Sequence, residues 1–270
     1  MMEWSVISAV NDKSVLGRCL LSSPDIARAR DLILQSGCRS AAAAYNAGIG
    51  EARTDLLVLV HQDVYLPEGW ISSLRRAVAR LSTQDPEWGV LGVWGVLRSG
   101  EGRGFLYCGA NRRILGRAFE GGAEVETLDE VLLVVRKSSG LRFDERLAGF
   151  HMYGADICME ARRQGRRNYA IGAFCIHNTN QHGMLPLAFW RGYLGMRRKW
   201  RAQLPIKTTC TEITRWCWPM VRWNVVRAIN LATGRDKPPT KRVSDPAPLY
   251  EELVAAGVVQ PAGNRLSDSR

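Results

Sequence analysis

The sequence predicts an α/β protein with a parallel sheet, and three observations indicate this class. Short apolar runs alternate with helix-like segments over about the first 80 residues, as in strand–helix–strand units. Residues 56–60 are apolar at every position, which is typical of a strand buried on both faces of a parallel sheet. Polar residues at 11–12 and 61–63 directly follow expected strands, where open α/β sheets bind ligands.

The first elements can be placed one by one along the chain. Residues 4–10 are apolar and β-branched, so we expect a strand that ends at an Asn-Asp turn and helix start. The elements expected next are a strand at 32–34, an alanine-rich helix at 40–52 behind a serine cap, the buried strand at 56–60, and a helix after Pro67 whose apolar face holds Trp70, Leu74, Val78 and Leu81.

The middle of the chain is richer in expected strands, and its composition then changes. Strands are expected at 90–97, 105–108, 131–135 and 169–176, with a helix at 156–164 before the last of them. After about residue 183, Trp, Arg and Lys become frequent. We therefore expect a main α/β domain over residues 1–183, a basic helical region over 184–236, and a loose tail over 237–270 with one short helix.

Cysteine usage and the absence of long apolar runs favour a cytoplasmic protein. The seven cysteines are an odd number and none stand in a C-x-x-C pair, so we expect free thiols rather than a disulfide framework or a zinc site. No run of about 18 apolar residues is present, and the first residues lack the pattern of a secretory signal.

The net charge of +11 is concentrated in one segment. Residues 197–242 contain twelve basic and two acidic residues, a net +10, which leaves +1 for the rest and indicates an acidic partner for this segment. Within it, Trp218, Val221, Val225 and Ile229 share one face of an expected helix. Three interpretations stay open: packing on the main domain, an interfacial helix on an anionic membrane surface, and nucleic-acid binding, which the neutral N-terminal part disfavours.

The polar clusters have plain structural explanations when each is considered alone. Asn11 and Asp12 could form a turn and a helix cap, Asp156 could be a helix N-cap, and His177 could be structural. Neither a G-x-G-x-x-G nor a G-x-x-x-x-G-K-[ST] motif occurs, so a dinucleotide fold or a phosphate loop is not supported.

Six segments, taken in chain order, nevertheless match a known family: residues 6–12, 44–49, 57–67, 141–145, 149–156 and 176–178. They resemble the inverting family 2 nucleotide-sugar glycosyltransferases, in the bacterial branch where His-Gln-Asp replaces the Asp-x-Asp metal motif. The resemblance covers roughly residues 4–180. It implies an A-type glycosyltransferase fold, a Rossmann-like and mostly parallel mixed sheet flanked by helices, here with a basic helical C-terminal appendage.

The resemblance also implies an activity and a site. A sugar would move from a nucleotide-sugar donor to a glycan or lipid-linked acceptor, at the inner face of the cell membrane if the acceptor is a lipid. Asp63 and His177 would bind Mn²⁺ or Mg²⁺, which neutralises the leaving diphosphate. Asp156 would be the catalytic base that deprotonates the acceptor. The residues implied to bind the nucleotide sugar are Asn11, Asp12, Asn46, His61 and Gln62.

Several positions depart from the family pattern. Residues 35–37 replace the usual Asp-Asp-Gly-Ser segment, so the identity of the nucleotide stays open. His61 replaces the first acid of the metal motif, and Ala155 replaces the glutamate that usually precedes the catalytic aspartate. Asp129 and Glu130 are near the expected acceptor site, although an exposed turn explains them as well. The alternatives are a sugar nucleotidyltransferase, which would need a glycine-rich phosphate loop, and a non-catalytic nucleotide-sugar-binding or scaffold protein.

Overall fold

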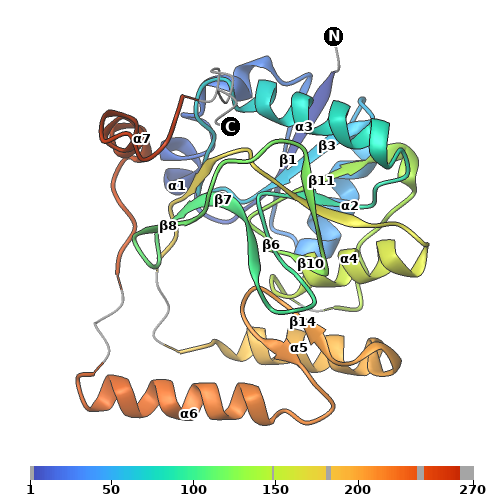
Figure 1. The fold of residues 1–270 in the computed structure, drawn as a ribbon, viewed down its shortest axis with the longest axis vertical. Helices are drawn as coiled ribbons and strands as arrows, with labels where there is room; N and C mark the ends of the chain where they lie inside the picture. The colour runs from blue at the N-terminus through green and yellow to red at the C-terminus, as the bar shows by residue number, and fades with distance from the viewer. Residues whose placement is uncertain (1–2, 148, 181–183, 236–239, 262–270) are drawn as a thin grey trace, which may run out of the picture.

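The fold is an α/β arrangement around two central sheets (Figure 1). The computed structural model describes residues 3–147, 149–180, 184–235 and 240–261. The first sheet has seven strands, in the spatial order β2 (Asp31–Ser36), β1 (Trp4–Val10), β3 (Leu56–Val60), β11 (Leu132–Arg136), β5 (Leu91–Gly92), β12 (Asn168–Ile171) and β9 (Gly122–Val125). The second has six, in the order β10 (Thr127–Leu128), β6 (Trp94–Val96), β7 (Gly102–Cys108), β13 (Cys175–His177) and β4 (Val64–Tyr65), with β8 (Arg113–Gly116) paired to β7.

The seven-stranded sheet is mixed, with its parallel part at the N-terminal half of the chain. Strand β1 pairs in parallel with β2 and β3, whereas β11 runs antiparallel to β3 and β5. All five residues of β3 are buried, as the unbroken apolar run predicts. The predicted class, an α/β fold with a mixed sheet flanked by helices, is confirmed.

Helices cover both faces of this sheet because β3 buries alternate side chains on opposite sides. Val58 and Val60 pack in the cluster that contains α3 (Trp70–Gln84) and its residues Trp70 and Leu74. Leu57 and Leu59 pack on the other side, with residues of α2 (Ala41–Glu51) and α4 (Tyr153–Arg163). The short helix α1 (Lys13–Arg18) follows β1 directly. The polar turns after β1 and β3 therefore lie at one edge of a sheet that is covered by helices on both faces.

Two expected boundaries shift in ways that affect the site. Helix α4 begins at Tyr153 rather than at Asp156, so Asp156 lies inside the first turn and does not cap the helix. The strand expected at 169–176 is two strands, β12 and β13, which belong to different sheets. The chain crosses between the sheets at Gly172, where a Cβ atom would clash with the backbone of Phe119.

The residues after 240 pack against the second sheet, where the composition led us to expect a loose tail. Helix α7 (Pro246–Ala255) places the ring of Tyr250 6.2 Å from that of Phe174, centroid to centroid. Val259 is 2% exposed in the same cluster. Asn178 fixes the approach, since its amide donates to the carbonyl of Val243 (2.9 Å) and accepts from its N–H (2.8 Å). Apolar side chains spaced along a Pro- and Ser-rich segment thus suffice to anchor it.

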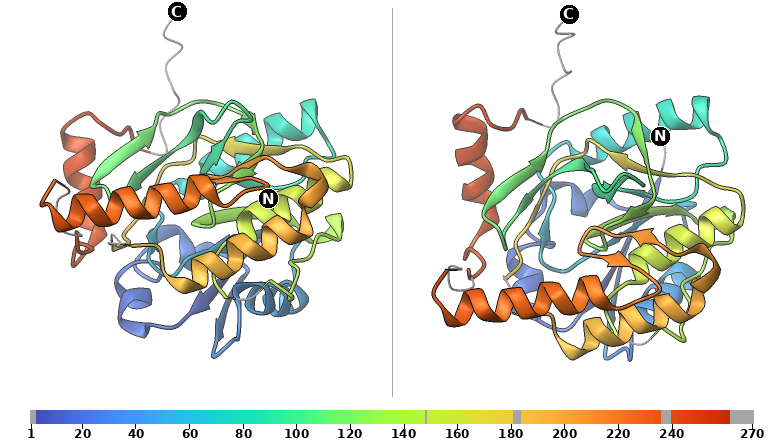
Figure 2. Two further views of the ribbon diagram at one scale, coloured as in Figure 1. Left: turned by 90° about the horizontal axis from the view of Figure 1, so that it is seen from below. Right: turned by 60° about the horizontal axis from the view of Figure 1, so that its bottom comes forward.

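The remaining elements form a layer beside the main fold, at the bottom of Figure 1 and in front in Figure 2. They are α5 (Leu187–Lys199), the short strands β14 (Ile206–Lys207) and β15 (Glu212–Ile213), and α6 (Trp218–Ala232). Tyr193, Met196 and Trp200 join α5 to Met159 of α4 in one buried cluster. In the described part of the chain, no helix is both long enough and apolar enough to span a bilayer.

Candidate functional site

A cavity of about 570 Å³ opens where β1, β2 and β3 end. This is the edge of the sheet at which the sequence places its polar clusters, and the volume is in the range of small-molecule sites. The cavity is lined by residues 9–11 and Lys13 after β1, residues 35–38 at the end of β2, residues 61–63 after β3, Ala41 and Tyr45 of α2, and Phe150 and Tyr153 at the start of α4.

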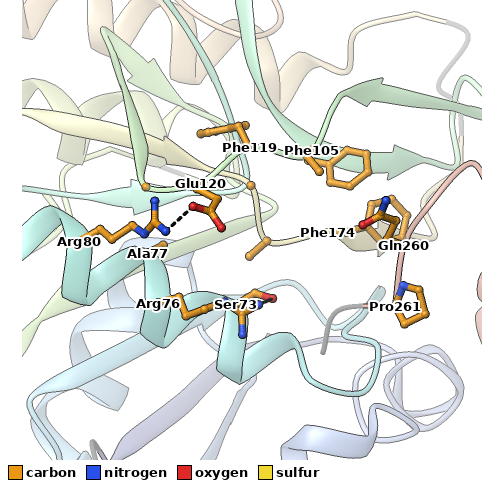
Figure 3. Close-up of a pocket in the computed structure, with 14 residues that line it drawn as sticks. Ser73, Arg76, Ala77, Arg80, Phe105, Phe119, Glu120, Phe174, Gln260 and Pro261 are labelled. Atoms are coloured by element: carbon orange, nitrogen blue, oxygen red, sulfur yellow. Dashed lines mark hydrogen bonds and ion pairs between the residues drawn. The ribbon is translucent and has the colours of Figure 1, made fainter. Parts of the chain in front are cut away.

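A second cavity, of about 80 Å³, lies between α3 and the end of the described chain (Figure 3). Gln260 and Pro261 line one side of it, and Arg80 of α3 forms an ion pair with Glu120 on the other. Glu120 is the acidic residue of this lining, and its charge is already paired. A space this small cannot hold a nucleotide, so the candidate site is the cavity at the ends of β1, β2 and β3.

Three potential metal ligands meet beside the larger cavity, and two of them, His61 and Asp63, line it. The ligand atoms of His61, Asp63 and His177 lie within 4.8 Å of one another. Among the described residues, these three are the group of His, Cys, Asp or Glu side chains that is close enough to hold a metal ion. Nε2 of His177 is 3.5 Å and Nδ1 of His61 is 3.9 Å from Oδ1 of Asp63. Two imidazoles and one carboxylate are a suitable set for a divalent transition ion such as Mn²⁺.

Strand pairing explains why residues so far apart in sequence meet. After β3 the chain turns through 61–63 into β4, which pairs antiparallel with β13 and sets Val64 opposite His177. The N–H of Asn178 donates to the carbonyl of Asp63 (2.8 Å), and the N–H of His61 donates to that of Val131 (3.1 Å). The backbone thus holds both ends of the turn, and the side chains of 61 and 63 face His177.

Asp63 and His177 each stabilise the charged form of the other. Burial alone would raise the pKa of Asp63, but the neighbouring His177 and His61 hold it well below its usual range. Burial would likewise lower the pKa of His177, but Asp63 raises it above its usual value. The pKa of His61 is lowered by burial, so His61 is the neutral imidazole of the group. A divalent cation would replace the proton on His177 in neutralising Asp63.

Gln62 fixes the loop after β1. Its side-chain carbonyl accepts from the N–H groups of Asn11 and Asp12, both at 3.0 Å, and its amide donates to the side chain of Asn11. Asp12 caps α1, because Oδ1 accepts from the N–H groups of Ser14 (2.9 Å) and Val15 (3.0 Å). Of the predicted nucleotide-binding residues, Asn11, His61 and Gln62 line the cavity, and Asp12 lies beside it as a helix cap.

Asn46 lies outside the cavity lining and ties two segments together. Its amide donates to the carbonyl of Phe143 (2.9 Å) and to Glu145 (3.2 Å), and its carbonyl accepts from the N–H of Phe143 (2.9 Å). The predicted match at residues 141–145 therefore has a structural explanation. Asn46 attaches this segment to α2.

Asp156 lies away from the cavity, in a buried ion-pair network. It is 1% exposed, and its two oxygens accept from Nζ of Lys199 (2.8 Å) and Nε1 of Trp200 (2.7 Å). Lys199 also pairs with Asp144 at 3.0 Å. Burial raises the pKa of Asp156, and Lys199 opposes that shift. Both oxygens are thus engaged by the end of α5, which this network attaches to α4.

Removing Lys199 is expected to destabilise the protein strongly. In Lys199→Met the buried carboxylate of Asp156 loses its counter-charge, which should lower the free energy of unfolding by ~3 kcal/mol, as for other broken buried pairs with one partly exposed partner. Chemical denaturation measures this change. Arg198→Met, on the exposed face of the same helix, is the matched control and should change stability by less than ~0.5 kcal/mol. Equal stabilities of the two variants would contradict the role given to the network.

Glu130 is linked to the ligand cluster through Tyr153. Oε1 accepts from the N–H of Gly154 (3.4 Å), and the first turn of α4 surrounds its carboxyl group. The hydroxyl of Tyr153 donates to the backbone carbonyl of Glu130 (3.2 Å) and lies 2.7 Å from Nε2 of His61, so it joins the Glu130 backbone to the ligand cluster. Burial, with the nearby Asp129, raises the pKa of Glu130 to about 8.

The glycine at 154 makes room for this carboxyl group. A Cβ atom there would lie 2.8 Å from Cγ of Glu130, so any larger residue would displace it. Met152 precedes this turn with φ at +69°, a strained conformation for a non-glycine residue that aims the first N–H groups of α4 at Glu130. The start of α4 is therefore built around Glu130.

The β14–β15 hairpin closes the site on the side of Asp129 and Glu130. The hydroxyl of Thr209 donates to Oδ2 of Asp129 (2.7 Å), and Oδ1 of Asp129 accepts from the N–H of Val131 (3.1 Å). The C-terminal region thus contributes to the site, although the family resemblance ended near residue 180.

Sequence reasoning missed several residues of this site. Tyr45 and Tyr153 line the cavity, and Lys13 lies at its mouth, but none was singled out. Tyr153 belongs to one of the matching segments, 149–156, so its proximity to the motif was an available signal. Thr209 had none, because only folding brings the hairpin to Asp129.

The chain is similar to a known protein family and to a curated relative. Residues 5–185 match the model of a family described as "Glycosyltransferase like family". A relative from Fuscovulum blasticum, "ATP synthase subunits region ORF 6", is 31% identical over 156 residues, which cover 55% of this chain and 61% of the relative. The chain therefore matches about three-fifths of the length of that curated relative.

Among solved structures, GalNAc-T7 with UDP, GalNAc and Mn²⁺ superimposes with a TM-score of 0.51 at 10% identity, over 73% of this chain and 48% of that one. Staphylococcus aureus TarS 1–349 in complex with UDP has a TM-score of 0.45 at 14% identity, over 65% of this chain and 60% of that one. The first likeness supports a common overall fold.

Proposed function

The chain belongs to the glycosyltransferase-like family, and we propose that it is a metal-dependent, inverting transferase of a sugar from a nucleotide-sugar donor. The observation that supports this most is the cluster of His61, Asp63 and His177, of which His61 and Asp63 line a 570 Å³ cavity beyond the ends of parallel strands. The family resemblance drawn from the sequence is confirmed at the level of the family.

The donor would occupy the cavity with its diphosphate towards the ligand cluster. Asn11 and Gln62 lie at the strand ends, and the rings of Tyr45 and Tyr153 offer apolar walls. Lys13 at the mouth is a cation within reach of an anionic donor. Residues 35–38 stand where the family has an acidic segment, so contacts to the nucleobase of the donor would come from Gln35, Ser36 or the backbone. The choice between UDP, GDP and dTDP is left to the experiment below.

The donor set fits a divalent cation, with Mn²⁺ favoured over Mg²⁺ because two of the three ligands are imidazoles. When bound, such an ion would supply the positive charge that stabilises the leaving diphosphate. Asp63 is the one carboxylate of the cluster, and its low pKa keeps it ionised and able to bind a cation across the neutral range. His61 is held by Tyr153, which orients its ring beside the other two ligands.

We place the catalytic base at Glu130 rather than at Asp156. A base must be within hydrogen-bonding reach of the acceptor hydroxyl, and both oxygens of Asp156 are buried against Lys199 and Trp200. The carboxyl group of Glu130 accepts only from backbone N–H groups at the start of α4 and, among the described residues, has no cation paired with it, while the residue is partly exposed. The backbone carbonyl of Glu130 is linked through Tyr153 to His61, and the pKa of its carboxyl group is raised to about 8. Asp156 would then be a positioning residue, which acts by attaching α5 to the first turn of α4.

The acceptor would approach from the side of the β14–β15 hairpin, where Asp129 and Thr209 lie beside Glu130. A glycan or a lipid-linked sugar presents the hydroxyl that this chemistry needs. In the proposed step, Glu130 takes the proton of that hydroxyl as its oxygen bonds to the sugar carbon, and the carbon–oxygen bond to the diphosphate breaks on the opposite face.

A panel of nucleotide sugars tests the proposal. UDP-, GDP- and dTDP-sugars are each incubated with the protein in Mn²⁺ or in EDTA, and the released nucleoside diphosphate is measured. We expect slow, metal-dependent release from donors of one nucleotide, with water as the acceptor. Tight donor binding without release, even with cell extract as a source of acceptors, would instead favour a binding protein.

The pH dependence of transfer follows from the raised pKa of Glu130. The base must be ionised, so kcat should rise with pH up to about 8 and fall by about tenfold per unit below that value. At pH 7 roughly one-tenth of Glu130 would be ionised. Measuring kcat between pH 6 and 9 checks this, with Glu130→Gln as the control whose residual profile should lose the rise. A profile that is flat above pH 5 would contradict the assignment.

A further inference from the structure

The apolar stripe of α6 faces away from the protein. Trp218, Val225 and Ile229 are 67%, 52% and 51% exposed, whereas the buried side chains of the helix are Met220 and Asn224. The stripe recognised in the sequence therefore does not pack on the main domain. An exposed apolar face of this kind is typical of an interaction surface.

A groove beside this stripe is lined by five arginines. Arg191, Arg197, Arg198, Arg201 and Arg215 surround a space of about 980 Å³. Arg197 donates to the backbone carbonyl of Arg215 at 2.9 Å, and among the described residues none of the five forms an ion pair with a carboxylate. The groove thus concentrates positive charge that the rest of the described chain does not neutralise.

The stripe and the groove belong to one surface. The groove is lined from α5 on one side and from Arg215 and Trp216, which directly precede α6, on the other. Figures 1 and 2 show α5 and α6 side by side on the outside of the molecule. Trp216 is 79% exposed where the two features meet. Tryptophan beside arginine and aliphatic residues is the composition of helices that lie in a membrane interface.

We propose that this surface, the outer side of α5 and α6, docks the protein on an anionic lipid bilayer. The apolar stripe of α6 would insert among the acyl chains, and the arginine groove would bind lipid phosphate groups. A second copy of the chain is the poorer partner, because a two-fold contact would set the arginines of both copies against each other without any carboxylate to pair them.

The position of this surface relative to the site is also informative. The β14–β15 hairpin lies between α5 and α6 in sequence, and its Thr209 contacts Asp129. Docking would therefore bring the acceptor side of the site near the bilayer surface, which favours a lipid-linked acceptor. This last point rests on the proposed function, whereas docking itself does not.

Vesicle binding by the full chain tests the proposal. The protein is sedimented with vesicles of phosphatidylcholine alone and with vesicles that also contain phosphatidylglycerol, at low and at physiological salt. We expect binding to the anionic vesicles, weaker binding at higher salt, and little binding to the neutral ones. Equal binding to both vesicles, or none, would overturn the proposal.

Two triple variants separate the contributions of the stripe and the groove. Trp218→Ser with Val225→Ser and Ile229→Ser should weaken the partition coefficient by at least ~100-fold. The second variant, Arg191→Gln with Arg198→Gln and Arg201→Gln, should weaken it by roughly 100-fold. All six side chains are exposed, so thermal unfolding should be unchanged.

Matched controls come from other exposed parts of the chain. Arg112→Gln with Arg113→Gln and Arg117→Gln removes the same charge at β8, and Leu21→Ser with Val258→Ser removes exposed apolar side chains. Both controls should bind vesicles as the wild type does. If they weaken binding as much as the test variants, binding is not specific to α5 and α6 and the proposal fails.

Two further results would distinguish membrane docking from dimerisation and from the proposed function. A concentration-dependent dimer that the α6 variant abolishes, without vesicle binding, would assign this surface to a second copy. The two triple variants should bind nucleotide with wild-type affinity. If the wild type binds anionic vesicles but no nucleotide, the proposed function fails and the docking surface stands.

Discussion

Asp63→Ala is expected to abolish Mn²⁺-dependent nucleotide binding and to lower sugar transfer by roughly 10³-fold or more. Asp63 is the one carboxylate of the cluster, and it lies 3.5 Å and 3.9 Å from the ring nitrogens of His177 and His61. Without it, two imidazoles cannot neutralise a divalent ion or fix its position. Calorimetric titration with nucleotide and Mn²⁺ measures the loss, and a coupled assay measures transfer.

Two comparisons make this result specific. Asp55→Ala removes a carboxylate before β3, outside the cavity, and should leave nucleotide affinity unchanged. Asp63→Ala should also lower the pKa of His177, which loses the carboxylate that raises it, and an NMR titration of the imidazole reports this shift directly. Mn²⁺-dependent binding that survives in Asp63→Ala would exclude Asp63 as a metal ligand.

Glu130→Gln is expected to lower kcat by about 10²–10⁴-fold while nucleotide affinity stays near that of the wild type. The amide keeps the size of the side chain and can still accept from the N–H of Gly154, but it cannot take a proton. Transfer kinetics give kcat and KM separately, and the loss should be in kcat. Asp129→Asn, next to Glu130 but bonded to Thr209, is the neighbouring control and should have the smaller effect.

Asp156→Asn decides between the two carboxylates. On the present assignment, its main effect is a lower stability, because Lys199 and Trp200 lose the charged partner that attaches α5. At a temperature where the variant is folded, kcat should stay within about tenfold of the wild type. A ~10²-fold loss of kcat in folded Asp156→Asn, with Glu130→Gln near wild type, would show that Asp156 is the catalytic base, as the resemblance implied.

The parts of the site that follow directly from strands could be predicted from the sequence. Leu56–Val60 is apolar throughout, which leaves a buried strand as the simple interpretation, and the polar residues after it then lie at the sheet edge. His177 ends an apolar run in the same way. Both groups were therefore expected at the ligand-binding edge, and the family resemblance implied that Asp63 and His177 share a metal. The pairing of β4 with β13 that brings them together is known only from the fold.

The surroundings of Asp156 and Glu130 depend on contacts that no local pattern encodes. The start of α4 at Tyr153 follows from a strained Met152 and from the space above Gly154 that Glu130 fills. The partners of Asp156 come from α5, beyond the segment that resembles the family. Asp156 lies in a segment that resembles the family and Glu130 in an expected exposed turn, and only these long-range contacts distinguish the surroundings of the two carboxylates.

The C-terminal region shows the same limit in another form. Periodicity grouped Trp218, Val221, Val225 and Ile229 on one face of α6, but it could not show that three of them face the solvent while Val221 is half-buried. The segment after residue 240 reads as polar, yet Tyr250 and Val259 find apolar partners on the second sheet. The spacing of apolar residues shows which side chains share a face of a helix. What that face contacts depends on the rest of the fold.

Calorimetric titration of the wild-type protein with UDP, GDP and dTDP, each in Mn²⁺ and in EDTA, tests the central claim most directly. The cluster of His61, Asp63 and His177 predicts that one of these nucleotides binds in Mn²⁺ and that EDTA removes the binding. Equal affinity in Mn²⁺ and in EDTA, or no binding of any of the three, would contradict a metal-dependent nucleotide-sugar site in this cavity.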